Sequence, residues 1–198
     1  MLQSPLIFLL SPANLNGRRG AMLLDPAAQF PLAQQLRSDE GAELGDVFSF
    51  VSSLYFRGKL SYARAFGRAP GDRRAAYVIS AGGGLCHPEE RVSLERLRNW
   101  AHVSIRHDNP HYTAPLVRHA NALLEGSSAD ARFVLLGSVA SDKYVQPLLD
   151  VFGSALLFPE QFAGLGDMSR GALLLHAVRE RAELAYAQVA GLHPSPRS

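Results

Sequence analysis

Short, almost wholly apolar segments alternate along this chain with longer amphipathic ones. Strands with apolar side chains on both faces are typical of a parallel sheet that is covered on both sides. The segments that predict strands are Leu6–Leu10, Ala75–Ser80, Phe133–Leu136, Ala155–Phe158 and Leu184–Val189. Strands that alternate with helical segments indicate an α/β fold.

The amphipathic segments carry apolar residues at helical spacing, as at Val47, Val51 and Leu54. The predicted helices are Asp46–Phe66, Leu94–Ala101, Ala114–Leu124, Asp142–Phe152 and Met168–Arg179. Thr113 and Asp167 are the expected N-caps of two of them. We therefore expect a single three-layer α/β/α domain over residues 1–190, with a mainly parallel central sheet of four to five strands. Residues 191–198 are expected to form a C-terminal tail.

Composition narrows the class of protein. With 198 residues, 47% hydrophobic and 19% charged, the chain is too apolar to be disordered and long enough to bury a core. Its single cysteine, Cys86, excludes a disulfide framework and a cysteine-rich zinc finger. No apolar run approaches the roughly 18 residues of a membrane span, and the first residues do not resemble a secretory signal. The sequence predicts a soluble cytoplasmic protein without membrane contact.

Positive charge is concentrated in one segment, although the formal net charge is only +2. The basic residues of this segment are Arg57, Lys59, Arg64, Arg68, Arg73 and Arg74. They stand against one acid, Asp72, and several of them share a face of the predicted helix. Such a pattern indicates either a polyanionic partner or a solvated helix face.

Small and polar residues follow the predicted strands at their carboxyl ends, where ligands bind in such sheets. They are Ser11, Asn14, Asn16, Arg18 and Arg19 after the first strand, Ser80 and Gly82–Gly84 after the second, and Ser138 after the third. We expect a ligand crevice there. The glycine run lets the backbone approach a flat ligand or an anion, or else it forms a tight turn after the strand. It has neither Walker nor dinucleotide spacing.

The segment Gly164–Gly171 opens a predicted helix and places Ser169 and Arg170 beside the free amides of the first turn. Helix N-termini favour anions, so this segment predicts a phosphate or carboxylate site. The alternative is that Asp167 only caps the helix while Arg170 pairs with a surface acid.

Motifs for metal or covalent catalysis are not evident. The seven histidines lack zinc-site spacing, and the segment from His107 to His111 fits turn chemistry as well as a metal site. No Gly-x-Ser-x-Gly elbow occurs and no motif surrounds Cys86, so covalent hydrolysis has no support from the sequence. We predict neither a metal site nor a cofactor.

Several short sequence motifs occur one after another between residues 5 and 178. Ile79-Ser80-Ala81-Gly82-Gly83-Gly84-Leu85, followed by Pro88-Glu89-Glu90, resembles the Leu-Ser-Ala-Lys-His-Gly-Leu and Pro-Asp-Glu signature of a bacterial and phage family. Further blocks that resemble this family are Ser53–Phe56 with Tyr62-Ala63, Trp100-Ala101, and Leu136-Gly137 with Lys143-Tyr144. This resemblance implies a uracil-DNA glycosylase-like fold. His193-Pro194-Ser195-Pro196 also resembles a loop of the uracil-DNA glycosylases.

A nucleobase pocket follows from this resemblance. In it, Asn14 would position a water for N-glycosidic hydrolysis and His193 would stabilise the leaving base. The expected substrate-binding residues are Ser11, Asn16, Ser80, Gly82, Gly83, Gly84 and Ser138, and the expected phosphate-binding residues are Arg18, Arg19, Lys143, Ser169 and Arg170. The chain departs from the pattern, because Gly82 and Gly83 replace the family's Lys and His. The water-activating Asp of the glycosylases also has no counterpart after the first strand.

These observations support a glycosylase that acts on DNA, and alternatively a non-catalytic module that binds a nucleotide or nucleic acid on the same fold. DNA is preferred over RNA as the partner. A protein-interaction domain with an acidic partner is a third hypothesis. The sequence leaves the base and the oligomeric state open.

Overall fold

The computed structural model describes residues 4–70, 74–140 and 142–191. Six strands form its central sheet, in the spatial order β4-β3-β1-β6-β7-β8. These strands are β1 (Leu6–Leu10), β3 (Ala76–Ser80), β4 (Gly84–Cys86), β6 (Arg132–Leu136), β7 (Leu156–Pro159) and β8 (Tyr186–Gln188). The four inner strands run parallel, and β4 and β8 pair antiparallel at the two edges.

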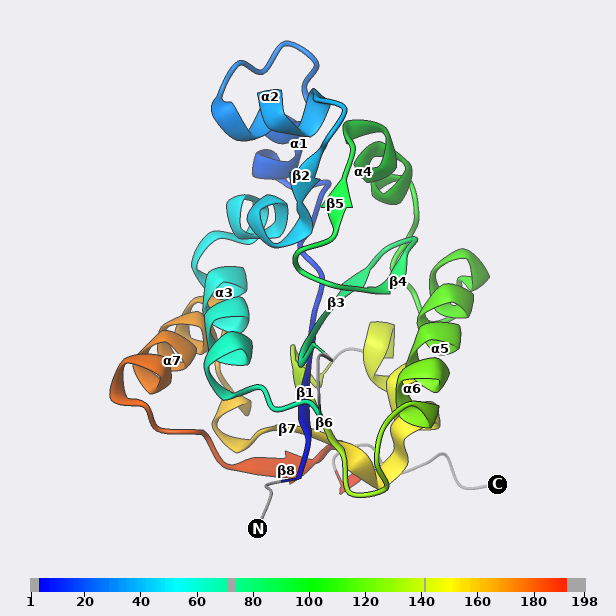
Figure 1. Cartoon of the computed structure of the whole chain (residues 1–198), viewed down its shortest axis with the longest axis vertical. Helices are drawn as coiled ribbons and strands as arrows, with labels where there is room; N and C mark the ends of the chain where they lie inside the picture. The colour runs from blue at the N-terminus through cyan, green and yellow to red at the C-terminus, as the bar shows by residue number, and fades with distance from the viewer. Residues whose placement is uncertain (1–3, 71–73, 141, 192–198) are drawn as a thin grey trace.

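Helices cover both faces of the sheet (Figure 1). On one side α3 (Leu44–Phe66) packs against α7 (Asp167–Glu180), and on the other α5 (Pro110–Glu125) packs against α6 (Asp142–Phe152). The predicted α/β class with a mostly parallel, doubly covered sheet is therefore confirmed. Among the described helices, none is long and apolar enough to cross a membrane.

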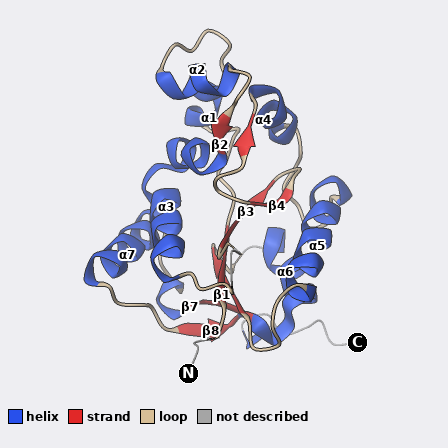
Figure 2. Ribbon diagram, viewed as in Figure 1, coloured by secondary structure: helices blue, strands red, loops and turns tan. Residues whose placement is uncertain are grey.

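A smaller group of elements lies beyond the carboxyl ends of the inner strands (Figure 2). It contains α1 (Arg18–Leu24), α2 (Pro31–Arg37), β2 (Ala42–Glu43), β5 (Arg91–Val92) and α4 (Leu94–Ala101), with β2 and β5 paired antiparallel. Three short 3-10 turns complete the fold: η1 (Gly153–Ala155), η2 (Glu160–Phe162) and η3 (Val189–Gly191). Gly191, which we assigned to the tail, ends η3.

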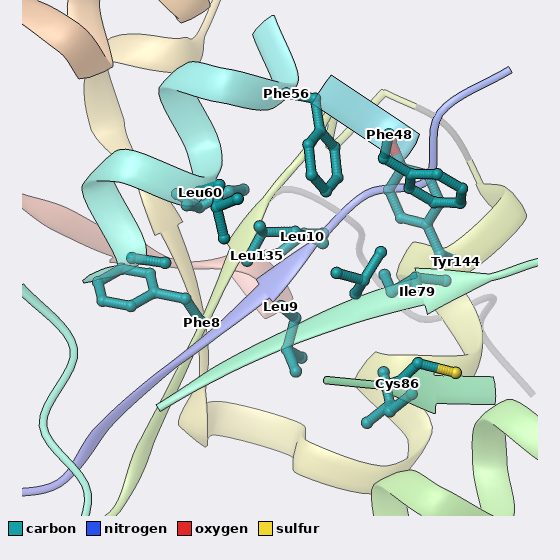
Figure 3. Packing of buried hydrophobic residues seen from close by; sticks show 14 of the residues in the cluster. Phe8, Leu9, Leu10, Phe48, Phe56, Leu60, Ile79, Cys86, Leu135 and Tyr144 are labelled. Atoms are coloured by element: carbon teal, nitrogen blue, oxygen red, sulfur yellow. The ribbon is translucent and has the colours of Figure 1, made fainter. Parts of the chain in front are cut away.

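The core explains why the strand positions were predictable. All five residues of β1 are buried. Figure 3 shows Phe8, Leu9 and Leu10 of this strand packed among buried side chains of other elements. Phe133 of β6 stacks on Phe152 of α6 with ring centroids 4.1 Å apart. A strand at the centre of such a sheet needs apolar side chains on both faces, and that requirement is visible in the sequence.

Several details differ from the predictions. The sheet has six strands rather than four to five, because the end of the glycine run pairs with β3 as the additional strand β4. Helix α5 begins at Pro110, with Asn109 rather than Thr113 as N-cap; the Asn109 side chain accepts a hydrogen bond from the His111 amide. Gly166 is the N-cap of α7, and Asp167 is its first residue. Helices α1 and α2 were not predicted, and both are only seven residues long.

Helices α3 and α7 approach each other through two glycines. A Cβ atom on Gly58 would lie 2.7 Å from the backbone oxygen of Gly171, and one on Gly171 would lie 2.9 Å from the Cα of Tyr55. Real Cβ atoms do not come this close to backbone, so only glycine permits this crossing. The contact fixes the start of α7 relative to the middle of α3.

Candidate functional site

The order of the parallel strands places a cleft at the centre of the sheet. The chain passes from β1 to its neighbour β3 on one side, and then crosses over to β6 on the other side of β1. Connections that leave in opposite directions create a crevice at the carboxyl ends of the two diverging strands. A cleft of about 630 Å³ lies at this point, with Ser11 after β1 and Ser138 after β6 among its lining residues. The predicted crevice is present.

Six parts of the chain line this cleft. They are the segment from Ser11 to Asn16, Ser52 and Tyr55 of α3, Ala81 after β3, the segment from Trp100 to Arg106 except His102, Ser138 with Lys143 and Tyr144, and Asp167 of α7. The tyrosines and Trp100 are largely buried and form its floor, whereas Asn14, Lys143 and Asp167 are exposed at its rim. The cleft therefore combines an apolar floor with a polar rim.

A break in α3 shapes one wall. Ser53 has φ 49° and ψ −124°, which no regular helix contains and which a residue with a side chain rarely adopts. Ser52 and Tyr55, on either side of the break, both line the cleft. Strained backbone of this kind persists only where the surrounding structure holds it, and it occurs preferentially at functional sites.

Lys59 of α3 lies beneath the cleft and is only 1% exposed. Its Nζ is 2.7 Å from the backbone oxygen of Ser11 and 2.9 Å from the Ser11 Oγ. The rings of Tyr55 and Phe56 lie near the same amine, with centroids 4.4 and 5.0 Å from Nζ. Burial lowers the pKa of Lys59 to about 7, and the negative charge of Asp167 opposes this shift. In the sequence Lys59 was counted only as one member of the basic segment; the structure buries it, apart from the exposed arginines of that segment.

Tyr144 joins the ends of β1 and β6. Its hydroxyl accepts a hydrogen bond of 3.0 Å from the Ser138 amide and interacts with the Ser11 hydroxyl. The nearby Tyr55 hydroxyl is buried and has no hydrogen-bond partner among the described residues. Burial raises the pKa of both tyrosines, so both hydroxyls keep their protons at neutral pH. Sequence reasoning missed Lys59, Tyr55 and Tyr144, because aromatic residues and a lone lysine at helical spacing carry no motif.

Asp167 is the only carboxylate that lines the cleft in the described part of the chain. Its side chain is 70% exposed, and one oxygen lies 3.5 Å from an Arg170 nitrogen. Arg170 is buried, and its guanidinium donates two hydrogen bonds of 3.3 Å to the backbone oxygen of Phe162. These bonds tie Arg170 to the protein itself, so it is not presented to a phosphate as we expected.

The structure brings together five predicted site residues at the cleft: Ser11, Asn14, Asn16, Ser138 and Lys143. The Asn14 Oδ1 accepts a hydrogen bond from the Asn16 amide, and the Asn16 side chain donates one to the backbone oxygen of Ala101. The Asn14 side-chain nitrogen has no hydrogen-bond partner within the described ranges. Asn16 therefore anchors the loop, and Asn14 offers a donor to a ligand.

The glycine run lies behind the cleft rather than in it. A Cβ on Gly82 would lie 2.7 Å from the Trp100 ring, and Gly84 has φ +68° with Pro115 backbone beside it. Ser80 is fully buried; its hydroxyl accepts from the Gly83 amide and donates to the Gly84 oxygen. These residues form the tight turn that was the alternative to a ligand-binding loop.

The remaining predicted residues lie elsewhere. Arg18, Arg19 and Ser169 are exposed and do not line the cleft; Arg19 instead donates to the backbone oxygen of Phe50. Of the five expected phosphate contacts, only Lys143 lies at the cleft. His193 lies outside the described residues.

Acids from distant segments neutralise much of the basic segment. Arg64 and Arg74 both pair with Glu89, at 3.3 and 2.6 Å, and Arg68 pairs with Glu183 at 2.8 Å. Arg73 lies outside the described residues. The segment therefore gives little support for a polyanion-binding surface.

Metal ligation has no visible basis within residues 4–70, 74–140 and 142–191, where no group of three or more His, Cys, Asp or Glu side chains is placed to hold an ion. Comparisons of the chain with protein-family models, with curated proteins and with solved structures find no match.

Proposed function

We propose that the cleft binds a nucleobase, presented by a nucleotide or by a nucleic-acid strand. The observation that carries this proposal is the cleft at the point where the strand connections diverge. At the rim of this cleft, the side-chain nitrogen of Asn14 has no hydrogen-bond partner within the described residues. Numbered in chain order, the four parallel strands run 2-1-3-4 across the sheet. Doubly wound sheets of this kind bind nucleotides at this divergence. The uracil-DNA glycosylase-like fold that the sequence resemblance implies is part of this proposal, although other doubly wound sheets share the same order.

The chemistry of the lining fits a planar ring with polar edges. A cleft of about 630 Å³ is within the usual range for small-molecule sites. Its apolar floor favours the faces of a base, and amide and hydroxyl groups at the rim can bond the base edge. Lys143, exposed at the rim, can approach a phosphate.

Replacing Asn14 by Ala is expected to weaken binding of the preferred base about tenfold, because a side-chain hydrogen bond to the ligand is lost. Calorimetric titration with nucleoside monophosphates and with single-stranded DNA, each at low and high salt, measures this effect. Asn121→Ala is the matched control, since Asn121 is exposed on α5 and bonds only within its own helix. If neither ligand class binds the wild-type protein, the proposal is wrong.

Hydrolysis of an N-glycosidic bond is a second candidate function, and the position of Asp167 favours it. The sequence has no acid after the first strand, but the fold brings this carboxylate from α7 to the same cleft as Asn14. An exposed carboxylate can orient a water and accept its proton while the base departs.

Asp167→Asn is expected to lower the rate of base release by at least about 100-fold, as loss of a general base does. Release of uracil and other altered bases from single-stranded DNA measures this rate, with Asp142→Asn as a control because Asp142 is exposed and outside the cleft. Equal rates in wild type and Asp167→Asn would remove the hydrolytic function and leave base binding in place.

A further inference from the structure

We propose that Ser11 and Lys59 form a nucleophile–base pair, so that the cleft can cleave a small carboxylic ester through an acyl-Ser11 intermediate. The inference concerns an activity beyond base binding and does not depend on it. The sequence gives no support for covalent hydrolysis, since Ser11 lies in no nucleophile motif. Only the fold brings the two residues together.

The geometry meets the first requirement of such a pair. The Lys59 Nζ lies 2.9 Å from the Ser11 Oγ, inside the 2.6–3.2 Å range over which a base takes a proton from a hydroxyl. A second hydrogen bond of 2.7 Å, to the backbone oxygen of Ser11, fixes the amine in this position. This second contact corresponds to the orienting group that a catalytic base needs, and serine–lysine pairs are a known variant of the catalytic triad.

The surroundings of Lys59 favour the neutral amine. Phe56 and Tyr55 flank it from its own helix, and no carboxylate lies within ion-pair distance of it among the described residues. The charged group of a neighbouring element that acts on it is Asp167 of α7; Tyr144 of α6 and Arg170 of α7 interact with the adjacent Ser11 and Tyr55 side chains. With its pKa lowered to about 7, Lys59 is substantially unprotonated in neutral solution and has a lone pair to accept a proton.

Both residues of the pair are buried. Ser11 lines the cleft and is 5% exposed, and Lys59 lies beneath it at 1% exposure. A side chain on Gly137 would crowd this position, because its Cβ would lie 2.8 Å from the Ser11 Cβ and 3.2 Å from the Ser11 Oγ. Glycine at position 137 therefore leaves room beside the Ser11 hydroxyl.

The reaction balances with these groups and one water. The Ser11 Oγ attacks the ester carbonyl carbon as its proton passes to the Lys59 amine, which gives a tetrahedral oxyanion and an ammonium. Collapse of the oxyanion breaks the bond to the alcohol oxygen, and Lys59 returns the proton to that oxygen. Water then attacks the acyl-Ser11 carbonyl with Lys59 again as base, which releases the carboxylic acid and restores Ser11.

Acetylation by p-nitrophenyl acetate tests the inference on the full chain. We expect a burst of p-nitrophenolate, and peptide mass mapping should locate the acetyl group on Ser11. The burst rate of the wild-type protein should rise with pH and level off above about 7, as Lys59 loses its proton. An acetyl group found only on other residues, or a Ser11 rate without this inflection, would overturn the inference.

Two variants distinguish a catalytic role of Ser11 and Lys59 from a purely structural one. Ser11→Ala should abolish the burst, and Lys59→Met should slow it at least about 100-fold and remove the inflection with pH. Ser169→Ala, at an exposed serine outside the cleft, should keep the wild-type rate. If circular dichroism shows that Lys59→Met does not fold, the pH profile of the wild-type protein and the mapped position of the acetyl group still test the inference. Nucleotide binding is measured without this probe, so a failure of one proposal leaves the other open.

Discussion

The stability advantage of wild type over a Lys59→Met variant is expected to grow as pH rises from about 7 to about 10. The folded protein holds Lys59 with a pKa of about 7, against 10.5 for an unburied lysine. Below pH 7 the amine is protonated in both states, and the folded state bears the full cost of burying the charge. Between pH 7 and 10.5 the unfolded chain binds more protons than the folded one. The free energy of unfolding then rises by up to about 1.4 kcal/mol per pH unit from this one group.

Denaturant unfolding of both proteins at several pH values measures this prediction. Methionine carries no proton, so the difference between the two free energies isolates Lys59 from other groups that titrate in the same range. Tyr55, whose ring lies beside the amine, has a raised pKa and keeps its proton over this interval. A difference that stays constant with pH would mean that Lys59 has an ordinary pKa. It would also weaken the case for Lys59 as a base.

Gly58→Ala is expected to destabilise the protein by about 2–3 kcal/mol, although alanine is the better helix former by about 1 kcal/mol. The new Cβ would lie 2.7 Å from the backbone oxygen of Gly171, so α3 and α7 must move apart. Displacement of α7 also moves Asp167 at the cleft and Arg170 beside it. We therefore expect weaker ligand binding together with the loss of stability.

Gly166→Ala is the matched control for this substitution. Gly166 has an ordinary φ of −80°, and no atom lies within 4 Å of the position its Cβ would take. Its replacement should change the free energy of unfolding by less than about 1 kcal/mol, the usual cost at an N-cap. Similar effects of the two substitutions would show that the helix crossing is not as tight as the structure places it.

The sheet was largely predictable, and its edges were not. The runs that form β1, β3, β6 and β7 are apolar because strands inside a doubly covered sheet have no face towards water. By contrast, β8 contains half-buried and exposed residues, so its pattern did not show that it runs antiparallel. The three-residue strand β4 begins at the last glycine of a run that we interpreted as a ligand-binding loop or a tight turn, not as a strand.

The position of the cleft was predictable from the sequence, but only some of the residues that line it were. Residues that follow adjacent strands, such as Ser11 and Ser138, meet at one edge because the strands are parallel. Tyr55 and Asp167 reach the same cleft from helices whose position depends on the crossing of α3 and α7. No local pattern in the sequence records that crossing.

The sequence by itself determined the α/β class, the positions of the inner strands and the edge of the sheet at which a crevice forms. The class and the strand positions follow from hydrophobic periodicity within a few residues, which is a local property. The edge follows because ligands bind beyond the carboxyl ends of parallel strands. Only the tertiary structure determined which charged side chains are buried and which acids pair with them. It buried Lys59 against Ser11 and paired Arg64 and Arg68 with acids far along the chain. The sequence shows that a side chain is charged whether it becomes buried or stays exposed. The solvation of that charge and its partners depend on which distant segments fold against it.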